Sequence, residues 1–325
     1  MKRSALIALT CCCLLALTAM PARGMTLPGY TVWTYQHPGA PITGFRDINN
    51  AGDVVGYYQT DAANFNSAQA LEIIGGAAQS ITIPTATSDR RAFGNNDAGD
   101  VAGSFNNSGS HGFVRTSGGF ITIDYPGTTQ GTTIRGLNNL GDLAGEYDDA
   151  AGQHGFVRIG GGYQTVDVPG AASTTVRAIN DAGHMAGFSL DASGIGQGFT
   201  SADGVGFTII NHPDPSAVST LIGGINNSGA VVGVWLAAAG SPETQPARGF
   251  LLDGGVYTPI DLAGAISTIP LALNDHGQIA GEAIAPNGTH YGFIATPIPS
   301  PGSGLIMLIG LTAILRRGSS KLSRL

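Results

Sequence analysis

Three arginines recur at one position of a repeated pattern: Arg46, Arg135 and Arg177 each lie six residues before a turn glycine. A guanidinium can donate paired hydrogen bonds to a carboxylate or a phosphate. If the three side chains line one channel, they predict a binding site for an anionic sugar polymer. The second interpretation is that the arginines form ion pairs with aspartates of neighbouring units. The pattern favours these ion pairs over the binding site.

Two acids share another position of the pattern. Glu146 and Glu282 each follow a glycine directly, in the third and the sixth unit, which stand opposite each other in a six-membered ring. A pair of acids can hydrolyse a glycosidic bond only when the carboxyl groups are about 5–10 Å apart. Strands outside the innermost ones are farther apart than that across a ring, so a carbohydrate-active enzyme (glycoside hydrolase or lyase) is only the alternative function.

The other polar candidates favour structural roles. His111 and His154 occupy the same place in adjacent units, but other units have Gln197, Arg248 and Tyr291 there, which predicts a polar hairpin position. The aspartates that follow turn glycines are expected to accept hydrogen bonds from turn amides. The sequence has no His-Glu-x-x-His, Gly-x-Ser-x-Gly or phosphate-binding glycine motif. We therefore expect no catalytic residue, no metal and no cofactor.

Six copies of a short unit must position these residues. An Asn-x-x-Gly turn recurs, and a second glycine follows each turn glycine four residues later. The six turns are Asn49-Asn-Ala-Gly52, Asn96-Asp-Ala-Gly99, Asn138-Asn-Leu-Gly141, Asn180-Asp-Ala-Gly183, Asn226-Asn-Ser-Gly229 and Asn274-Asp-His-Gly277. Fixed self-similarity at 42–48 residues is typical of propellers and other repeat folds.

Each unit reads as four short strands. Apolar and polar residues alternate, and asparagine and glycine occupy the turns, where φ is positive. In the fourth unit the expected strands are 174–179, 184–189, 196–200 and 206–210. A Gly-Phe pair marks the third strand of five units, and the first unit has Ala70-Leu71 instead. Four strands in this length are the size of one propeller blade.

The N-terminal part of the body predicts how the array closes. Residues 30–39 match the last segment of a unit, whereas the sixth unit ends in prolines and has no fourth strand of its own. We therefore expect residues 30–35 to form the outer strand of the last blade, which removes an exposed sheet edge. An open stack or β-solenoid is the alternative. The predicted fold is a six-bladed β-propeller of four-stranded blades over residues 25–296.

The unit resembles the HAF repeat family of bacterial extracellular proteins, named for a His-Ala-Phe signature. His111-Gly-Phe113 and His154-Gly-Phe156 are the closest matches, and the Asn-Asn-x-Gly-Asp turn agrees. The resemblance spans nearly all of residues 30–295. It implies an extracellular β-rich array and brings no catalytic residues.

Composition narrows the class of partner. Residues 25–300 contain eight arginines, no lysine and 22 acidic residues, a formal charge of −14. This balance argues against nucleic acid, which requires a basic surface to displace counterions. All three cysteines, Cys11, Cys12 and Cys13, precede this body, so a disulfide framework or a thiolate metal site is excluded there.

The two ends are expected to direct the chain out of the cytoplasm. Residues 1–24 show the charged, apolar and small-residue order of a signal peptide. Residues 297–325 combine a Pro-rich linker, an apolar stretch at 304–315 and a basic end. The positions that carry this interpretation are Pro297, Pro299, Pro301, Arg316 and Arg317. The apolar stretch predicts a C-terminal hydrophobic helix in the membrane, held by the arginines on the cytoplasmic side.

This tail resembles the PEP-CTERM class of bacterial sorting signals, over about 25 residues. It differs from the class in having no glutamate between the prolines and eight residues after the arginines. The resemblance implies processing by an exosortase-type enzyme and an association with exopolysaccharide. A plain membrane anchor is the alternative.

We thus expect an exported, monomeric interaction module at the cell surface, in the envelope or outside the cell. Its expected partners are polysaccharide or another envelope component, the processing enzyme, and the membrane through the C-terminal helix until any processing.

Overall fold

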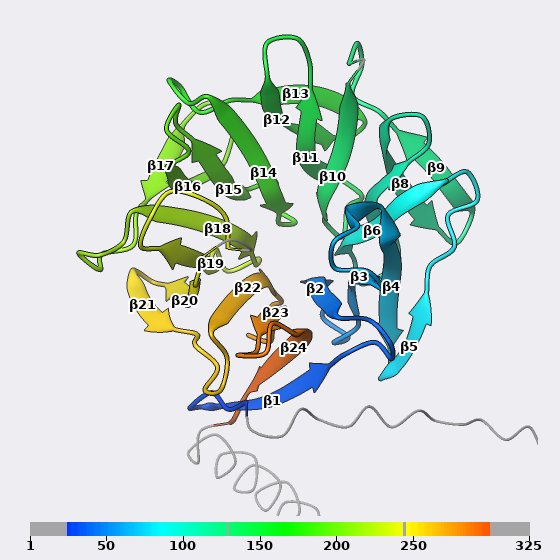
Figure 1. Ribbon diagram of the computed structural model, residues 1–325. Coiled ribbons are helices and arrows are strands. Elements are labelled where there is room, and N and C mark those ends of the chain that lie inside the picture. The colour runs from blue at the N-terminus through cyan, green and yellow to red at the C-terminus, as the bar shows by residue number, and fades with distance from the viewer. Residues whose placement is uncertain (1–24, 129, 243–244, 300–325) are drawn as a thin grey trace, which may run out of the picture.

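The computed structural model describes residues 25–128, 130–242 and 245–299. In these residues the chain forms twenty-four strands and one short 3-10 helix, η1 (Phe65–Ser67). The strands form antiparallel sheets that are arranged in a ring (Figure 1). The fold is therefore an all-β propeller, as the repeats predict.

We number the four-stranded blades in chain order. Blade 1 contains β2 (Ile42–Ile48), β3 (Val54–Gln59), β4 (Ala68–Ile74) and β5 (Ala77–Ser80). Blade 2 contains β6 (Ser88–Asn95), β7 (Val101–Asn106), β8 (Ser110–Thr116) and β9 (Gly119–Ile123). Blade 3 contains β10 (Gly131–Leu137), β11 (Leu143–Asp148), β12 (Gln153–Ile159) and β13 (Gly162–Val166).

The second half of the chain continues the pattern. Blade 4 contains β14 (Ser173–Ile179), β15 (Met185–Leu190), β16 (Gly196–Ser201) and β17 (Phe207–Ile210). Blade 5 contains β18 (Ser219–Ile225), β19 (Val231–Leu236), β20 (Arg248–Asp253) and β21 (Val256–Pro259). Blade 6 contains β22 (Ser267–Leu273), β23 (Ile279–Ile284), β24 (His290–Pro297) and β1 (Tyr30–Tyr35). Blades 2 and 3 count as one eight-stranded sheet only because a single parallel bridge joins Ser110 to Gly131.

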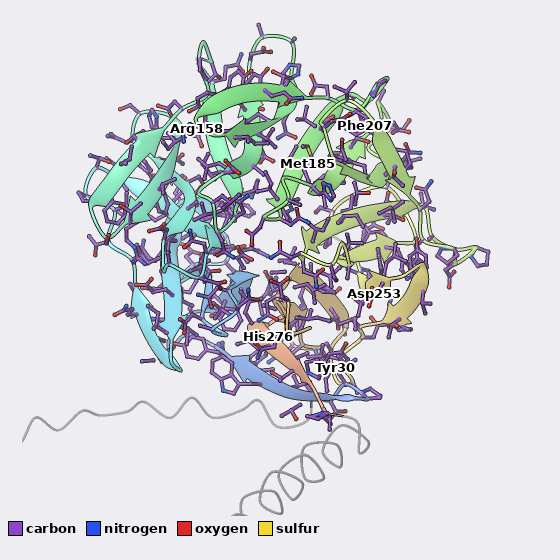
Figure 2. The ribbon with its side chains drawn as sticks, turned by 180° about the vertical axis from the view of Figure 1, so that it is seen from behind. Tyr30, Arg158, Met185, Phe207, Asp253 and His276 are labelled. Carbon is purple, nitrogen blue, oxygen red and sulfur yellow. The ribbon has the colours of Figure 1, made fainter. Side chains whose placement is uncertain are left out.

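The last blade takes its outer strand from the start of the body. β1 pairs antiparallel with β24 along its whole length, from Tyr30 opposite Pro297 to Tyr35 opposite Gly292. Figure 2, turned by 180°, shows Tyr30 on this outer strand. The pairing confirms the prediction that residues 30–35 complete the last blade. An open stack, in which the first strand would pair only with its sequence neighbours, is not what forms.

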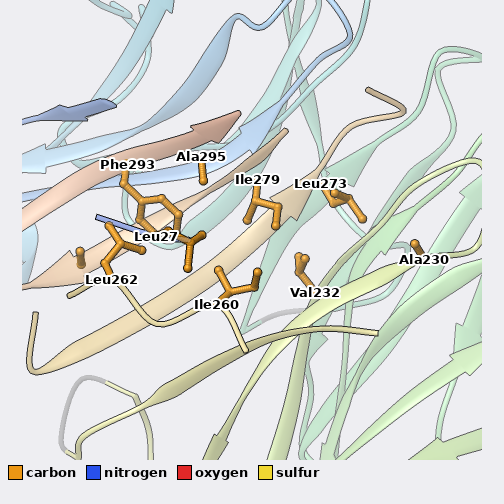
Figure 3. Packing of buried hydrophobic residues seen from close by; sticks show 10 residues of the cluster. Leu27, Ala230, Val232, Ile260, Leu262, Leu273, Ile279, Phe293 and Ala295 are labelled. Carbon is orange, nitrogen blue, oxygen red and sulfur yellow. The ribbon is translucent and has the colours of Figure 1, made fainter. Parts of the chain in front are cut away.

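The core lies between the blades. The phenylalanine of each Gly-Phe pair is at most 1% exposed, and Leu71 takes its place in blade 1. Figure 3 shows the layer between blades 5 and 6, where Val232 and Ile260 of one blade pack against Ile279 and Phe293 of the other. Truncating such an aromatic side chain to alanine typically costs about 3–5 kcal/mol.

The two ends of the sequence fall outside this description. The signal peptide predicted at 1–24 and the membrane helix predicted at 304–315 lie outside the described residues. Within 25–299, apart from 129, 243 and 244, no helix has the length and apolar character needed to cross a membrane.

A first ring of hydrogen bonds joins all six turns. In blade 3 the Asn138 Oδ1 accepts the backbone N–H groups of Leu140 and Asp142, which holds the turn. The Asn138 Nδ2 donates to the backbone oxygen of Asn180 in the next blade, at 3.0 Å. The same bond to the next blade links Asn49 to Asn96, Asn96 to Asn138, Asn180 to Asn226, Asn226 to Asn274 and Asn274 back to Asn49. One repeated residue therefore both caps its own turn and ties the ring shut.

A second ring comes from the next residue of each turn. This residue alternates between asparagine and aspartate around the ring: Asn50, Asp97, Asn139, Asp181, Asn227 and Asp275. Each asparagine Nδ2 donates to the carboxylates on both sides, as Asn139 does to Asp97 (3.1 Å) and Asp181 (3.0 Å). Alternation keeps every carboxylate away from a like-charged neighbour and beside two amide donors.

We predict that Asn139→Asp destabilises the protein by about 1–2 kcal/mol at pH 7, because two donors are lost and three carboxylates become neighbours. Protonation at pH 3 restores a donor and removes the repulsion, so the loss shrinks. Urea denaturation of the variant and the parent at both pH values measures it.

Asn287→Asp is the matched control, because Asn287 is exposed and only caps a turn by accepting from Thr289, which aspartate does equally well. Equal losses for Asn139→Asp at pH 7 and pH 3 would show that the alternation does no electrostatic work.

Candidate functional site

A β-bulge on each innermost strand turns one residue toward the axis. β2, β6, β10, β14, β18 and β22 all shift register at the same place. The residues at the shift are Arg46, Phe93, Arg135, Arg177, Gly223 and Leu271, and these six together line a constriction of about 10 Å³. Bulges re-aim side chains out of the regular alternation. The three arginines therefore line one channel, which was one of the two interpretations of the sequence, and Phe93 lies between Arg46 and Arg135.

The repeated second glycine is what makes room for each bulge. Gly145 on β11 lies opposite Ile134 of β10, just before the register shift. A Cβ on Gly145 would lie 2.2 Å from the carbonyl oxygen of Thr133 and 2.9 Å from the ring of Phe156. In the other blades the corresponding carbonyl distance is 2.0–2.4 Å. The glycine that follows each turn glycine by four residues thus permits the feature that aims the arginines inward.

The constriction separates two spaces on the axis. A shallow one of about 90 Å³ is lined by the turns and carries the asparagine and aspartate rings. A wider one of about 350 Å³ lies where the innermost strands begin. Its basic side chains are Arg46, Arg91, Arg135 and Arg177. We call the wider space the axial cavity.

An ion pair between blades 1 and 6 borders the axial cavity. The Arg46 Nη2 donates to Glu282 Oε2 at 2.9 Å and to the Tyr57 hydroxyl at 2.6 Å. Glu282 also pairs with His290, and its side chain is 2% exposed. Burial alone would raise the pKa of Glu282, but Arg46 and His290 lower it below the usual value. Gly44 leaves the space that the Glu282 carboxylate fills, because a Cβ on Gly44 would lie 2.5 Å from Glu282 Oε2.

A second pair lies within blade 3. Arg135 donates to Glu146 Oε1 through Nε, at 3.0 Å, and through Nη2. Burial would raise the pKa of Glu146, and the guanidinium groups of Arg135 and Arg177 hold it below its usual value. Both acids singled out in the sequence are thus ionised and paired. This arrangement supplies no protonated acid, which glycoside hydrolysis requires.

Aromatic rings hold the guanidinium groups in place. Arg46 and Arg91 both lie over Tyr57, at 4.7 and 4.5 Å from the ring centre. Arg135 lies over Phe93 at 4.4 Å, and Arg177 over Phe188 at 5.8 Å. Stacking of this kind fixes the plane of the guanidinium and so the direction of its N–H groups.

Sequence reasoning missed Arg91 and the identity of the partners. Arg91 precedes Phe93 by two residues on β6, and its Nε pairs with Asp89 at 2.7 Å. The period of two along a strand was the signal that could have found it. Ion pairs with aspartates were expected for Arg46 and Arg135, but both partners are glutamates. Glu146 lines the axial cavity itself, whereas Glu282 reaches it only through Arg46.

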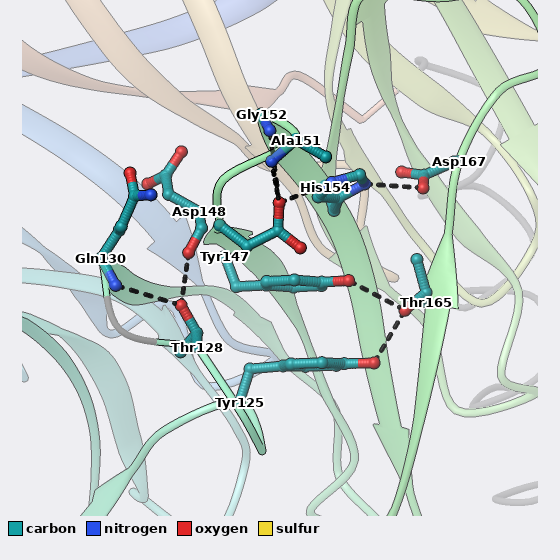
Figure 4. A network of polar contacts seen from close by, with 11 residues as sticks. Tyr125, Thr128, Gln130, Tyr147, Asp148, Ala151, Gly152, His154, Thr165 and Asp167 are labelled. Atoms are coloured by element: carbon teal, nitrogen blue, oxygen red, sulfur yellow. Dashed lines mark hydrogen bonds and ion pairs between the residues drawn. The ribbon is translucent and has the colours of Figure 1, made fainter.

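The histidines and turn aspartates have local partners. His154 Nδ1 lies 2.8 Å from Asp167, beside stacked Tyr125 and Tyr147 rings whose hydroxyls meet at Thr165 (Figure 4). His111 has the equivalent partner, Asp124. The turn aspartates Asp53 and Asp142 each accept the N–H of a hairpin glycine, as expected.

No described part of the chain brings together three histidine, cysteine or acidic side chains in an arrangement that could hold a metal ion. Of the predicted sorting positions, Pro297 ends β24 and Pro299 follows it, while Pro301, Arg316 and Arg317 lie outside the described residues.

Blade 1 has one partly buried acid, Asp47, at a position where the other blades have glycine or alanine. Asp47 follows Arg46, and its carboxylate accepts the backbone N–H groups of Ile48 and, across the blade boundary, of Asn95. Burial raises the pKa of Asp47 to about 7, although these two hydrogen bonds oppose the rise. Between about pH 4 and pH 7, the Asp47 carboxyl is therefore protonated in the folded protein and ionised in the unfolded chain.

We predict that Asp47 makes the protein less stable as pH rises from about 4 to about 7. In this window the folded state binds one more proton than the unfolded state, so its contribution falls by roughly 1.4 kcal/mol per pH unit. Above pH 7 the contribution is constant. The free-energy difference between the parent and Asp47→Asn, measured by denaturation from pH 4 to pH 8, isolates this effect. A difference that stays level across that range would contradict it.

Comparisons with known proteins support the fold and nothing finer. No protein-family model and no curated protein matches the sequence. TolB from Acinetobacter baumannii is similar in structure, with a TM-score of 0.50 and 11% identity over 74% of this chain. The match spans 63% of the TolB chain. A mutant of AofleA from Arthrobotrys oligospora has a TM-score of 0.48 and 14% identity, covering 83% of this chain and 90% of its own. The Aleuria aurantia lectin AAL, in complex with Fucα1-6GlcNAc, has a TM-score of 0.44 and 12% identity, covering 85% and 98%. At 11% identity, the likeness to TolB is a likeness of fold alone.

Proposed function

We propose that this protein is a non-catalytic interaction module, which binds an acidic group of an envelope molecule in the axial cavity. One observation carries the proposal: of the eight arginines in residues 25–300, four line this single cavity. The body is acidic overall, so the cavity concentrates positive groups in a negative shell. Such an arrangement favours one small anionic group over a broad polyanionic surface.

The donor groups of the guanidinium side chains support this role. Arg46, Arg91 and Arg135 pair with the carboxylates of Glu282, Asp89 and Glu146. Each guanidinium has five N–H groups, and a carboxylate partner occupies only part of them. For Arg135, the bonds to Glu146 use Nε and Nη2 and leave Nη1 for another acceptor. An incoming carboxylate can therefore add to these pairs without breaking them.

The proposed location follows from the two ends of the sequence. The signal-like start and the PEP-CTERM-like tail favour an exported chain that an exosortase-type enzyme or a plain membrane anchor retains at the envelope. The resemblance of the repeat to the HAF family points the same way. Acidic exopolysaccharide is the partner that these features favour.

Binding to the extracellular polysaccharide of the producing cells tests the proposal. The full chain, as the cells release it, is mixed with polymer whose carboxylates are intact or have been reduced to neutral hydroxyls. We expect binding only to the intact polymer, and weaker binding at 0.5 M salt than at 0.05 M, because exposed charges are screened. Equal binding to both polymers would contradict an anion-binding site.

We predict that deleting residues 297–325 moves the protein from the membrane fraction to the medium. The reason is that the deletion removes the apolar stretch and the basic end that would hold the chain in the bilayer. Immunoblots of membrane and medium fractions from cells with either form measure the change. Substituting only Arg316 and Arg317 by glutamine is the control, since it keeps the apolar stretch. An unchanged distribution for the deletion would show that the tail is no anchor.

A further inference from the structure

The wall of the axial cavity is divided by chemistry. The guanidinium groups come from the innermost strands of blades 1 to 4, together with the polar side chains of Tyr57, Glu146, Gln153 and Thr175. The remaining arc is mainly apolar, and the one polar side chain that the structure describes there is Ser241, in the loop after β19. Its apolar side chains in the strands are Phe188, Leu190, Leu221, Ile222, Val234, Ile269, Pro270 and Leu271, on β15 of blade 4 and on the inner strands of blades 5 and 6.

The apolar arc is a fixed surface. Leu221, Val234, Ile269 and Leu271 are each at most 8% exposed and belong to one hydrophobic cluster, on which Phe188 and Leu190 pack. Their positions are set by the packing between blades 5 and 6, so they do not turn away to admit polar groups. A hydroxyl placed against such a wall loses its hydrogen bonds to water without a replacement.

The basic arc also carries a buried carboxylate. Glu146 is 5% exposed and lines the cavity, where the side chains of Arg135 and Thr175 hydrogen-bond to it. An incoming carboxylate therefore meets the guanidinium groups through N–H groups that Glu146 does not use, such as Nη1 of Arg135.

We propose that the axial cavity binds an amphipathic carboxylate, with its acidic group on the arginines and an apolar body against the wall of blades 5 and 6. The inference rests on the proposed function, because it assumes that this cavity is the binding site, and it adds the class of group that is bound. The volume of about 350 Å³ suits a small molecule or the end of a larger one. A plain sugar acid satisfies only the basic arc, so an acidic polysaccharide would bind best through a carboxylate that carries an apolar substituent.

Titration calorimetry with chemically defined probes tests this inference on the full chain. The carboxylate series is acetate, butyrate and hexanoate. Glucuronate is the hydrophilic anion and hexanol the neutral apolar probe. We expect affinity to rise along the series by up to about fourfold for each added methylene, because each one buries apolar surface. Glucuronate and hexanol should bind at least about tenfold more weakly than hexanoate.

Arg135→Gln separates binding from folding. Arg115 pairs with buried Glu72 elsewhere, and the two ion pairs have the same exposures, 22% for the arginine and 6% for the glutamate. Arg115→Gln is therefore the matched control, and Arg135→Gln and Arg115→Gln should lower the unfolding temperature by similar amounts. Only Arg135→Gln should weaken hexanoate binding, by at least about tenfold, since a charge-assisted hydrogen bond is lost. If Arg135→Gln does not fold, Arg177→Gln takes its place.

Val234→Thr tests the apolar wall against a control on the same strand. Val234 lines the cavity, while Val232 is two residues away in β19 and packs in a different cluster. We expect Val234→Thr to weaken hexanoate binding about fourfold and to leave acetate binding unchanged, and Val232→Thr to change neither.

The outcomes separate this inference from the function on which it rests. Equal affinity for glucuronate and hexanoate would overturn the amphipathic ligand and leave an anion site. Hexanol bound as tightly as hexanoate would overturn the carboxylate half of the inference. If no anion binds, or if Arg115→Gln weakens binding as much as Arg135→Gln does, the axial cavity is not the site and both proposals fall.

Discussion

Closure of the ring is the constraint on which the rest of the structure depends. The six innermost strands approach so closely that a Cβ on Gly223 would lie 2.8 Å from the Cα of Leu271, and one on Gly136 would lie 3.0 Å from the Cα of Ala178. At this spacing no blade can shift alone. The asparagine ring adds a hydrogen bond at every boundary, and the bond from Asn274 to Asn49 is the same bond as the five others. The boundary where the chain begins and ends is thereby made equivalent to the rest.

Once the ring is closed, a small local feature becomes a site. A bulge in a single sheet would point one side chain out of the pleat and into water. Six bulges at the same place in six converging strands turn six residues toward one another. Five of these residues have side chains, three of them arginines, and the sixth is Gly223. Because Arg46 pairs across the boundary of blades 6 and 1 with Glu282, the site also depends directly on the closure. The differences between blades then decide its chemistry, with guanidinium groups on one arc and a hydrophobic cluster on the other.

The repeat made the architecture predictable from the sequence. The Asn-x-x-Gly turns located the inner hairpins, the Gly-Phe pairs located the third strands, and the unit-like segment at 30–35 located the closing strand. Arg46, Arg135 and Arg177 could be aligned because their place in the unit is fixed. The partners of the arginines and the apolar arc could not be predicted from the sequence, because contacts between blades determine them. Glu282 is far from Arg46 in the sequence, and only the ring brings them together. The apolar arc consists of ordinary core residues, which nothing in their own strands distinguishes from Val232.

The alternation of asparagine and aspartate in the second turn position was visible in the six turns, but its meaning required the ring. Along the chain the two residues look interchangeable, since both suit a turn. Around a closed ring of even number they become donor and acceptor in strict order. A ring with an odd number of blades would place two like residues side by side.

Disulfide formation between β1 and β24 tests the closure most directly. Residues 25–325 contain no cysteine, so no native thiol in them can compete with the two that are introduced. Thr31 lies opposite Thr296 in this pair, and both are exposed. With cysteine at both positions, the folded chain should form an intramolecular bond under mild oxidation, and its unfolding temperature should rise, while each single substitution leaves a monomer with a thiol. If the double variant stays reduced, or if the bond joins two chains instead, the ring is not closed by its first strand and the axial cavity described above does not exist.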